Sequence, residues 1–141
     1  MESKQVGVWG EKIARNYLKD RGYKILDKNY VFRIPGDKQR GEIDIVARRK
    51  RNVLDVVKNR KKSILFVEVK TLMSGEQFPA ISPEQKVNYP KQRKLVKAAE
   101  SWLMKNKVPL DSPWQIDIIS VIINKNTGKP KIKYFKNAVG S

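Results

Sequence analysis

The chain has 141 residues, carries 31 Lys and Arg against 14 Asp and Glu for a formal net charge of +17, and contains neither Cys nor His. These absences exclude disulfides, zinc sites built on thiolate or imidazole, cysteine nucleophiles and any catalysis that needs a histidine base. The charge predicts a polyanionic partner, because an unmatched excess of one sign repels itself in the folded state. Nucleic acid is favoured over an anionic membrane surface, and a heat-adapted surface would enrich both signs of charge.

The first predicted element is an amphipathic helix over residues 3–21. Apolar residues recur three or four apart in it, as one helix face requires: Val6, Trp9, Ile13 and Tyr17. Gly22 follows as a C-cap glycine would. Glu11 lies just beyond the edge of the apolar stripe, so it either faces a cleft or is an exposed helix carboxylate.

Three strands are predicted next, over residues 23–32, 41–48 and 64–71, and they form a meander. The connection at 48–62 is strongly basic and has apolar residues at its centre. Two interpretations stay open for it: a solvated loop whose charges prevent edge pairing, or an arm that grips phosphates.

The second half of the chain predicts a loop over residues 73–90, a helix over 91–107 and a hairpin of strands over 114–123 and 131–135. The expected order is therefore α-β-β-β-α-β-β, an α/β fold with a mixed sheet flanked by helices. The length suits one domain spanning residues 1–141. No stretch is apolar enough to cross a membrane and no leader is evident, so we expect a cytoplasmic protein without a membrane partner.

Acidic residues interrupt two of the predicted strands. Alternation along the second strand sends Ile43 and Ile45 to one face and Glu42 and Asp44 to the other. In the third strand the same rule places Glu68 and Lys70 together on one face, while Val67 and Val69 point into the core. A buried Glu-Lys pair that merely neutralises itself is the alternative, although such pairs rarely stabilise a fold better than apolar residues do.

If these two strands are neighbours, Asp44 and Glu68 can reach one divalent cation, and the carbonyl of Val69 can join them. Oxygen ligands of this kind suit Mg²⁺ or Mn²⁺, which also bind phosphate oxygens. Lys70 could then orient an attacking water or stabilise charge that develops on the phosphate. The sequence therefore predicts a metal-dependent phosphodiesterase, with a basic nucleic-acid-binding module that lacks turnover as the alternative.

Several segments together resemble the YraN-type family of small bacterial proteins. These are Gly10-Glu11-Lys12-Ile13-Ala14, Gly22-Tyr23-Lys24-Ile25-Leu26, Asn29-Tyr30, Gly41-Glu42-Ile43-Asp44-Ile45-Val46-Ala47, Phe66-Val67-Glu68-Val69-Lys70-Thr71, Lys91-Gln92-Arg93 and Ile116-Asp117. The resemblance covers almost the whole chain.

This resemblance implies the restriction-endonuclease-like fold of the PD-(D/E)xK nucleases, whose members include Holliday-junction resolvases. It implies metal ligation by Asp44 and Glu68, a catalytic role for Lys70, and places in the active site for Glu11 and Gln92. A DNA substrate with branches or irregularities is favoured over RNA, and a homodimer is expected from the fold. The basic residues expected to contact the nucleic acid are Arg48, Arg49, Lys50, Arg51, Arg60, Lys61, Lys62, Lys91 and Arg93.

Two features depart from the family pattern. Relatives commonly carry Arg after the Glu-Val-Lys-Thr run, whereas this chain has Leu72, so one phosphate contact is expected to be missing. The basic connection at 48–62 is also longer than expected. Substrate preference is therefore expected to differ from that of relatives.

Overall fold

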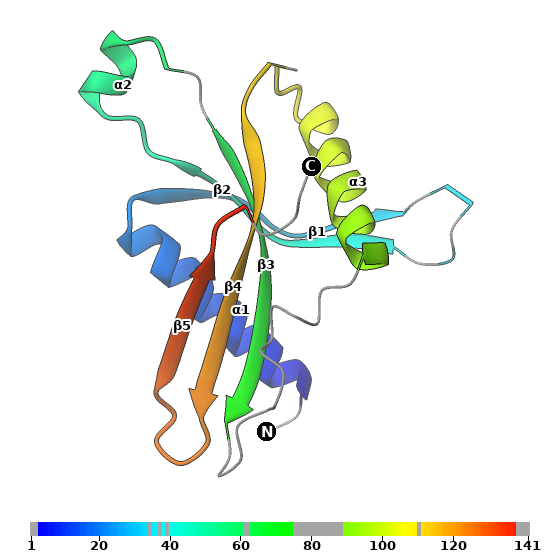
Figure 1. Cartoon of the computed structure of the whole chain (residues 1–141), viewed down its shortest axis with the longest axis vertical. Coiled ribbons are helices and arrows are strands. Elements are labelled where there is room, and N and C mark those ends of the chain that lie inside the picture. The colour runs from blue at the N-terminus through cyan, green and yellow to red at the C-terminus, as the bar shows by residue number, and fades with distance from the viewer. Residues whose placement is uncertain are drawn as a thin grey trace.

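The structure is a computed structural model that describes residues 3–33, 35, 36, 38, 40–60, 63–74, 89–109 and 111–137. A five-stranded sheet of order β1-β2-β3-β4-β5 lies between two long helices (Figure 1). In chain order the elements are α1 (Ser3–Asp20), β1 (Tyr23–Arg33), β2 (Arg40–Arg49), α2 (Val53–Val57), β3 (Ile64–Ser74), α3 (Tyr89–Lys105), β4 (Trp114–Asn124) and β5 (Pro130–Phe135). The predicted mixed α/β fold is thereby confirmed.

The sheet combines two kinds of strand pairing. β1, β2 and β3 form the predicted antiparallel meander, and β4 with β5 forms the predicted hairpin. β3 and β4 are parallel, with Ile64 opposite Trp114 and Ser74 opposite Asn124. Parallel neighbours need a crossover connection, and α3 lies within it.

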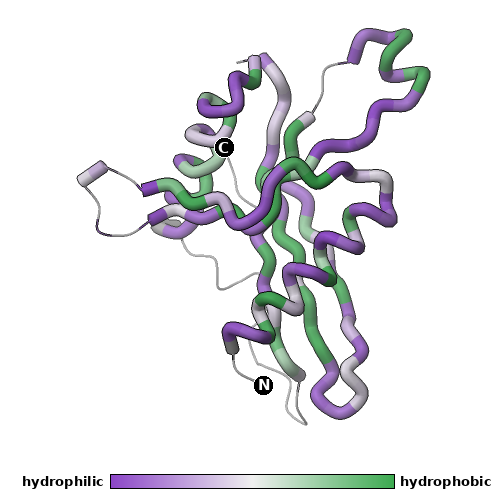
Figure 2. Tube along the Cα trace, turned by 180° about the vertical axis from the view of Figure 1, so that it is seen from behind, coloured by the Kyte–Doolittle hydropathy of each residue, from purple (hydrophilic) through white to green (hydrophobic). Residues whose placement is uncertain are grey.

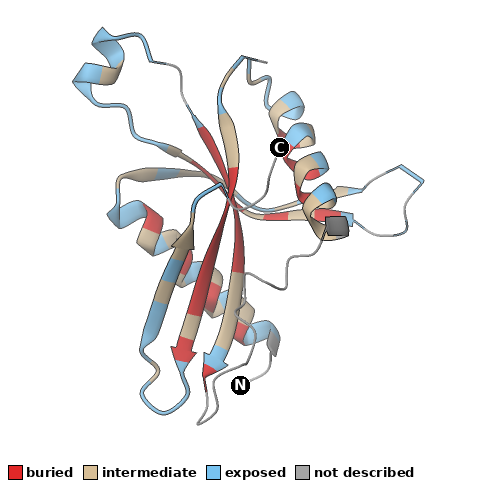
Figure 3. Ribbon diagram, viewed as in Figure 1, coloured by how far each residue is buried: buried red, intermediate tan, exposed pale blue. Residues whose placement is uncertain are grey.

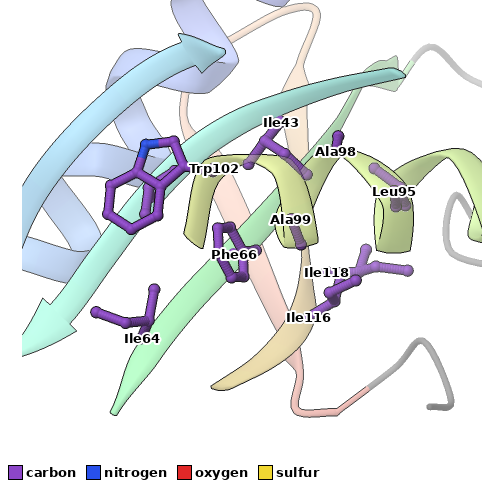
Figure 4. Close-up of a cluster of buried hydrophobic side chains, with 10 residues drawn as sticks. Ile43, Ile64, Phe66, Leu95, Ala98, Ala99, Trp102, Ile116 and Ile118 are labelled. Atoms are coloured by element: carbon purple, nitrogen blue, oxygen red, sulfur yellow. The ribbon is translucent and has the colours of Figure 1, made fainter. Parts of the chain in front are cut away.

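Each face of the sheet carries its own hydrophobic cluster under one helix. On the α3 face, Phe66 contacts Trp102 edge to face, with ring centroids 5.7 Å apart, and Leu95, Ala98 and Ala99 complete the helix side (Figure 4). On the α1 face, Ala14 and Leu18 are fully buried against Val67, Ile119 and other apolar strand residues. Buried residues therefore concentrate along β3, β4 and the inner sides of the two helices (Figure 3).

Glycines let the helices approach the sheet closely. A Cβ on Gly41 of β2 would lie 2.7 Å from the backbone carbonyl oxygen of Lys94 and 3.2 Å from the Cβ of Ala98, both on α3. A Cβ on Gly10 of α1 would overlap the side chain of Thr71 on β3. Both helices are thus packed tightly against the strands that carry the acidic residues.

One connection contains an unpredicted helix, and another lies largely outside the described residues. The basic connection contains a helix, α2, that the sequence analysis did not predict. Its start could have been recognised from Asn52 and Asp55, which form a capping box. The predicted loop at 73–90 falls largely outside the described residues. At its margins, β3 continues to Ser74 and α3 begins at Tyr89.

Candidate active site

The site is built where β2 and β3 stop pairing. Their antiparallel ladder runs from Arg48 opposite Ile64 to Ile45 opposite Val67. At the next residue of β2, the carboxylate of Asp44 accepts a hydrogen bond of 2.8 Å from the backbone N–H of Val69. A carboxylate thus replaces the strand partner that this buried N–H requires. Because the N–H and C=O of one strand residue point to the same side, the carbonyl of Val69 points into the same gap.

The strict alternation predicted for β2 is wrong at this point. Ile43 packs with Val46 in the cluster under α3, whereas Ile45 packs in the cluster under α1. The reason lies in the course of the strand. On the N-terminal side of Ile45, β2 no longer pairs with β3, and the β1–β2 hairpin passes toward α3 (Figure 1). Across β1, Asn29 has a positive φ of 52° and falls between the pairs Lys28–Ile45 and Tyr30–Ile43, hence opposite Asp44.

Glu68 of β3 is buried, with 6% of its surface exposed, and two lysines contact the same carboxylate oxygen. Its Oε1 lies 3.4 Å from the Nζ of Lys70 and 2.9 Å from the Nζ of Lys91. Lys70 comes from the same strand, as predicted. Lys91 comes from the first turns of α3, so helix packing brings a second cation to the acidic residue.

A cavity of about 470 Å³ opens over the gap between the strands. Acidic residues from three elements line it: Glu11 of α1, Glu42 and Asp44 of β2, and Glu68 of β3. Lys4 and Val8 of α1, Asn29 of β1 and Thr71 of β3 belong to the same wall. The expectation that Glu11 faces a cleft is therefore met, and Asn29 is a lining residue that the sequence analysis did not single out.

Burial and neighbouring charges raise the pKa of two of these residues, Asp44 and Glu11. Burial raises the pKa of Asp44 to about 8, and the negative charges of Glu68 and Glu11 add to the effect, while the N–H of Val69 opposes it. Burial also raises the pKa of Glu11, although its hydrogen bond with Asp44 pulls in the other direction. Acidic groups held this close attract a cation, because a positive charge among them removes the repulsion.

The two lysines differ in their electrostatic surroundings. Burial lowers the pKa of Lys70, and its contact with Lys91 lowers it further. For Lys91, burial acts in the same direction, but the charge of Glu68 and the contacts with Lys70 and Glu68 outweigh it and raise the pKa. Lys70 is thus the lysine that releases its proton more readily.

The donor set fits a hard divalent cation. Asp44, Glu68 and the carbonyl of Val69 supply oxygen atoms from two strands to one gap. No group of three or more carboxylates among the described residues stands ready to hold a metal ion by itself. Mg²⁺ does not need such a cage, because it typically takes one or two carboxylates, keeps several waters and binds phosphate oxygens of the substrate.

The other residues named from the sequence lie at varying distances from this cavity. Gln92 follows Lys91 on α3, is half-buried and is not among the described residues that line the cavity. Arg93 is exposed on the same helix. Arg48 is half-buried at the end of β2, while Arg49, Lys50, Arg51 and Arg60 are exposed on the connection that follows. Lys61 and Lys62 lie outside the described residues.

Lys91 is the contact that sequence reasoning placed differently. It was predicted to bind nucleic acid, whereas the structure holds it 2.9 Å from Glu68. No spacing in the chain could reveal this contact, because residues 68 and 91 meet only once α3 has packed on the sheet. For Asn29 a signal existed, since Asn is uncommon inside strands and tolerates positive φ.

Asp117 of β4, by contrast, has a structural role. It is buried, and it accepts hydrogen bonds from the side chain of Gln115 at 2.8 Å and from the backbone N–H of Asn137 at 2.6 Å. The hydroxyl of Tyr134 donates a third hydrogen bond, and burial together with Asp117 raises the pKa of Tyr134. These contacts fasten β5 and the following turn to the sheet.

The fold is a mixed five-stranded sheet flanked by helices, and acidic residues with a lysine lie where two of its strands separate. This arrangement is compatible with a restriction-endonuclease-like fold. Comparison with known sequences gives the family: the profile of the uncharacterised protein family UPF0102 matches residues 10–121. A UPF0102 protein of Clostridium botulinum is 33% identical over 136 residues, covering 96% of this chain and 94% of the relative. A UPF0102 protein of Alkaliphilus oremlandii is 37% identical over 139 residues, covering 96% and 98%.

The chain therefore belongs to the UPF0102 family, and the resemblance to YraN-type proteins is confirmed. The match covers nearly the full length of these relatives. None of the described helices combines the length and the apolarity needed to cross a bilayer.

Proposed function

We propose that this protein is a metal-dependent phosphodiesterase that cleaves nucleic acid, DNA in preference to RNA, at branched or irregular structures. The observation that carries the proposal is the gap between β2 and β3, where Asp44 and Glu68 line one cavity with Lys70 in contact with Glu68. Carboxylates on neighbouring strands with an adjacent lysine suit hydrolysis of a phosphodiester.

Mg²⁺ or Mn²⁺ would be held by Asp44, Glu68 and the carbonyl of Val69. When bound, such a cation polarises the scissile phosphate and lowers the pKa of a coordinated water. Lys70 would then orient the attacking water or, when protonated, stabilise negative charge on the phosphate. Glu11 lines the same cavity as Asp44 and adds its charge to the carboxylate cluster.

Lys91 acts as a counterion of Glu68 in the metal-free protein. Its Nζ and that of Lys70 neutralise a buried carboxylate that would otherwise be costly. Lys91 would have to leave this oxygen if the oxygen were to bind a divalent cation. The displaced ammonium is then close enough to the site to contact a phosphate, which reconciles its observed position with its predicted role.

The substrate class follows from charge. A net charge of +17 favours binding to a polyanion in a salt-dependent manner. Exposed basic residues follow the end of β2 and continue into the connection to β3, and Arg93 adds another on α3. These residues are suited to contact phosphates of a bound nucleic acid.

The direct test is cleavage of single-stranded, duplex and junction DNA, and of RNA, in Mg²⁺ or Mn²⁺. We expect Asp44→Ala and Lys70→Ala to reduce turnover by at least about 100-fold, as the loss of a catalytic group typically does. Lys97→Ala is the matched control, because Lys97 is an exposed lysine of α3 that does not line the described cavity. Cleavage that persists unchanged in both site variants would end the proposal.

A second candidate function is nucleic-acid binding without turnover. It is favoured by the two ion pairs of Glu68, which satisfy the carboxylate without any metal. Calorimetry with Mg²⁺ separates the candidates. Metal binding that Glu68→Ala abolishes supports the enzyme, whereas no metal binding at millimolar concentration, with or without DNA, supports the binding module.

A further inference from the structure

The connection between β2 and β3 forms an arm that projects away from the sheet, with α2 at its tip (Figure 1). We call residues 50–60 the arm and the four aliphatic residues of α2 its apolar tip. The members of the tip are Val53, Leu54, Val56 and Val57, with exposures of 80%, 50%, 59% and 74%. Figure 2 shows these hydrophobic residues at the far end of the arm, between hydrophilic stretches.

Polar groups alone hold the arm in shape. The side chain of Asn52 accepts a hydrogen bond of 2.8 Å from the N–H of Asp55, and the carboxylate of Asp55 accepts one of 3.1 Å from the N–H of Asn52. Arg60 forms an ion pair of 3.3 Å with Asp55, and Arg51 donates a hydrogen bond of 3.2 Å to the carbonyl of Arg60. This network closes the base of the arm and caps its helix.

The aliphatic side chains contribute no core to the arm, since α2 has no buried residue. At about 100° per residue, the four of them spread over roughly 160° of the helix, and Asp55 lies on the opposite side. They make up four of the eight large hydrophobic side chains that are exposed among the described residues. Such a concentration of exposed apolar surface is typical of an interaction site.

The charge around the tip indicates what it contacts. Arg49, Lys50 and Arg51 precede it, and Lys58 and Arg60 follow it, all exposed. A second copy of the chain is a poor partner, because two strongly cationic arms repel each other and a five-residue helix buries far less than the ~800 Å² per partner of a stable interface. Helices that insert into membrane interfaces usually carry aromatic or several leucine side chains, and α2 has one leucine.

Nucleic acid meets both requirements, because its phosphates lie beside its apolar base faces. We propose that the arm is a wedge: its basic residues bind phosphates, and the apolar tip inserts against bases that a branch point or an unpaired end leaves unstacked. Proteins commonly insert aliphatic side chains between base steps in this way. The inference rests on the proposed function for its substrate, and it names branched or unstacked nucleic acid as the preferred form.

The test measures binding in EDTA, so it does not require turnover. Fluorescence anisotropy compares a three-way DNA junction that carries 2-aminopurine at the branch with a duplex of the same length. The wild type should prefer the junction and increase the 2-aminopurine emission. A variant with all four tip residues changed to Ser should bind the junction about tenfold more weakly and the duplex with unchanged affinity. The loss should equal the wild-type preference for the junction over the duplex.

Two comparisons make the result specific to the tip. Arg49→Gln with Lys50→Gln should weaken junction and duplex binding alike, because phosphate contacts do not distinguish them. Met104→Ser, at an equally exposed apolar residue of α3, should change neither. If the fourfold variant does not fold, Val53→Ser with Val57→Ser removes the two most exposed side chains and should show the same selective loss.

Several results would overturn the wedge. The first is a tip variant that keeps the wild-type preference for the junction. The second is a tip variant that keeps this preference but loses binding to anionic phosphatidylserine vesicles, or loses self-association in sedimentation. Equal binding of junction and duplex by the wild type would contradict the wedge proposal and leave the proposed nuclease function unaffected. Failure of the wild type to bind any nucleic acid would instead remove the proposed function itself.

Discussion

Asp44 accepts the hydrogen bond that a carbonyl of β2 would accept if the ladder to β3 continued. It therefore links two strands at the point where they separate, and its environment disfavours its ionised form. Its raised pKa of about 8 records this effect, caused by burial first and by Glu68 and Glu11 second. Stability and the proposed metal binding thus compete at one residue.

This competition predicts a pH dependence of the metal-free protein. Because the folded-state pKa of Asp44 lies above the ordinary value of 3.8, the folded state binds the proton more tightly than the unfolded state. The contribution of Asp44 to stability is therefore full below pH 3.8 and is lost as the pH rises to about 8. Urea unfolding in EDTA should show this decline.

Asp44→Asn should remove this part of the decline and be more stable than the wild type at pH 8, since the amide oxygen can still accept from Val69. The exposed carboxylate of Glu100, changed to Gln, serves as the control and should leave the decline in place. An Asp44→Asn protein whose stability falls with pH as steeply as that of the wild type would contradict the account.

Lys91 provides a second test at the scale of single residues. Because its ammonium lies 2.9 Å from Oε1 of Glu68, it competes with any cation that binds this oxygen. Lys91→Met should therefore bind Mn²⁺ several-fold more tightly than the wild type in calorimetry, while losing affinity for DNA. Arg93→Met, at an exposed neighbour on α3, should leave Mn²⁺ affinity unchanged. Weaker Mn²⁺ binding by Lys91→Met would show that the lysine organises the site instead of competing for it.

The candidate residues of the strands could be predicted from the sequence, and the contact made by the helix could not. A charged pair inside a β-branched run, Glu68 with Lys70, stands out because burying charge is costly. Whether the two act in catalysis stays a prediction. The contact of Lys91 depends on how α3 packs, which is a long-range property that local patterns do not contain.

At the scale of elements, close packing of α3 on β2 positions Lys91 over the strands. Gly41→Ala should destabilise the protein by about 1–3 kcal/mol, because the new methyl group meets the backbone carbonyl of Lys94 and that carbonyl cannot rotate away. Denaturant unfolding measures this change.

Gly7→Ala is the matched control for that substitution. Gly7 lies on α1, and a Cβ added there would meet nothing within 4 Å. The substitution should therefore stabilise the helix by about 0.5–1 kcal/mol. Equal effects of the two substitutions would contradict the packing argument.

Seven of the eight described elements could be predicted from the sequence, and the five-residue helix α2 was not. α1, β1 to β5 and α3 follow strong periodic patterns, so their existence and order could be read from the sequence. α2 has five residues, and its four aliphatic side chains fit a strand as well as a helix. The alternation predicted for β2 failed between Ile43 and Ile45 because the strand leaves β3 there while it stays paired with β1, which no local rule records.

At the scale of the whole molecule, the excess of positive charge should govern affinity for nucleic acid. The logarithm of the binding constant should fall linearly with the logarithm of salt concentration, and each phosphate contact removed should reduce the slope by about 0.9. Arg93→Gln tests one such contact by anisotropy at several salt concentrations. Lys129→Gln, in the turn between β4 and β5, is the control and should leave the slope as it is. An identical slope for all three proteins would place the DNA elsewhere.

The central claim is that Asp44, Glu68 and the carbonyl of Val69 share one cation. Anomalous diffraction from crystals soaked in Mn²⁺ tests it most directly, with Glu68→Ala crystals as the comparison. We expect one Mn²⁺ peak in the gap between β2 and β3, bonded to both carboxylates and absent from the variant. Density elsewhere on the protein, or a gap that still holds only the lysine ammonium groups at saturating Mn²⁺, would contradict it.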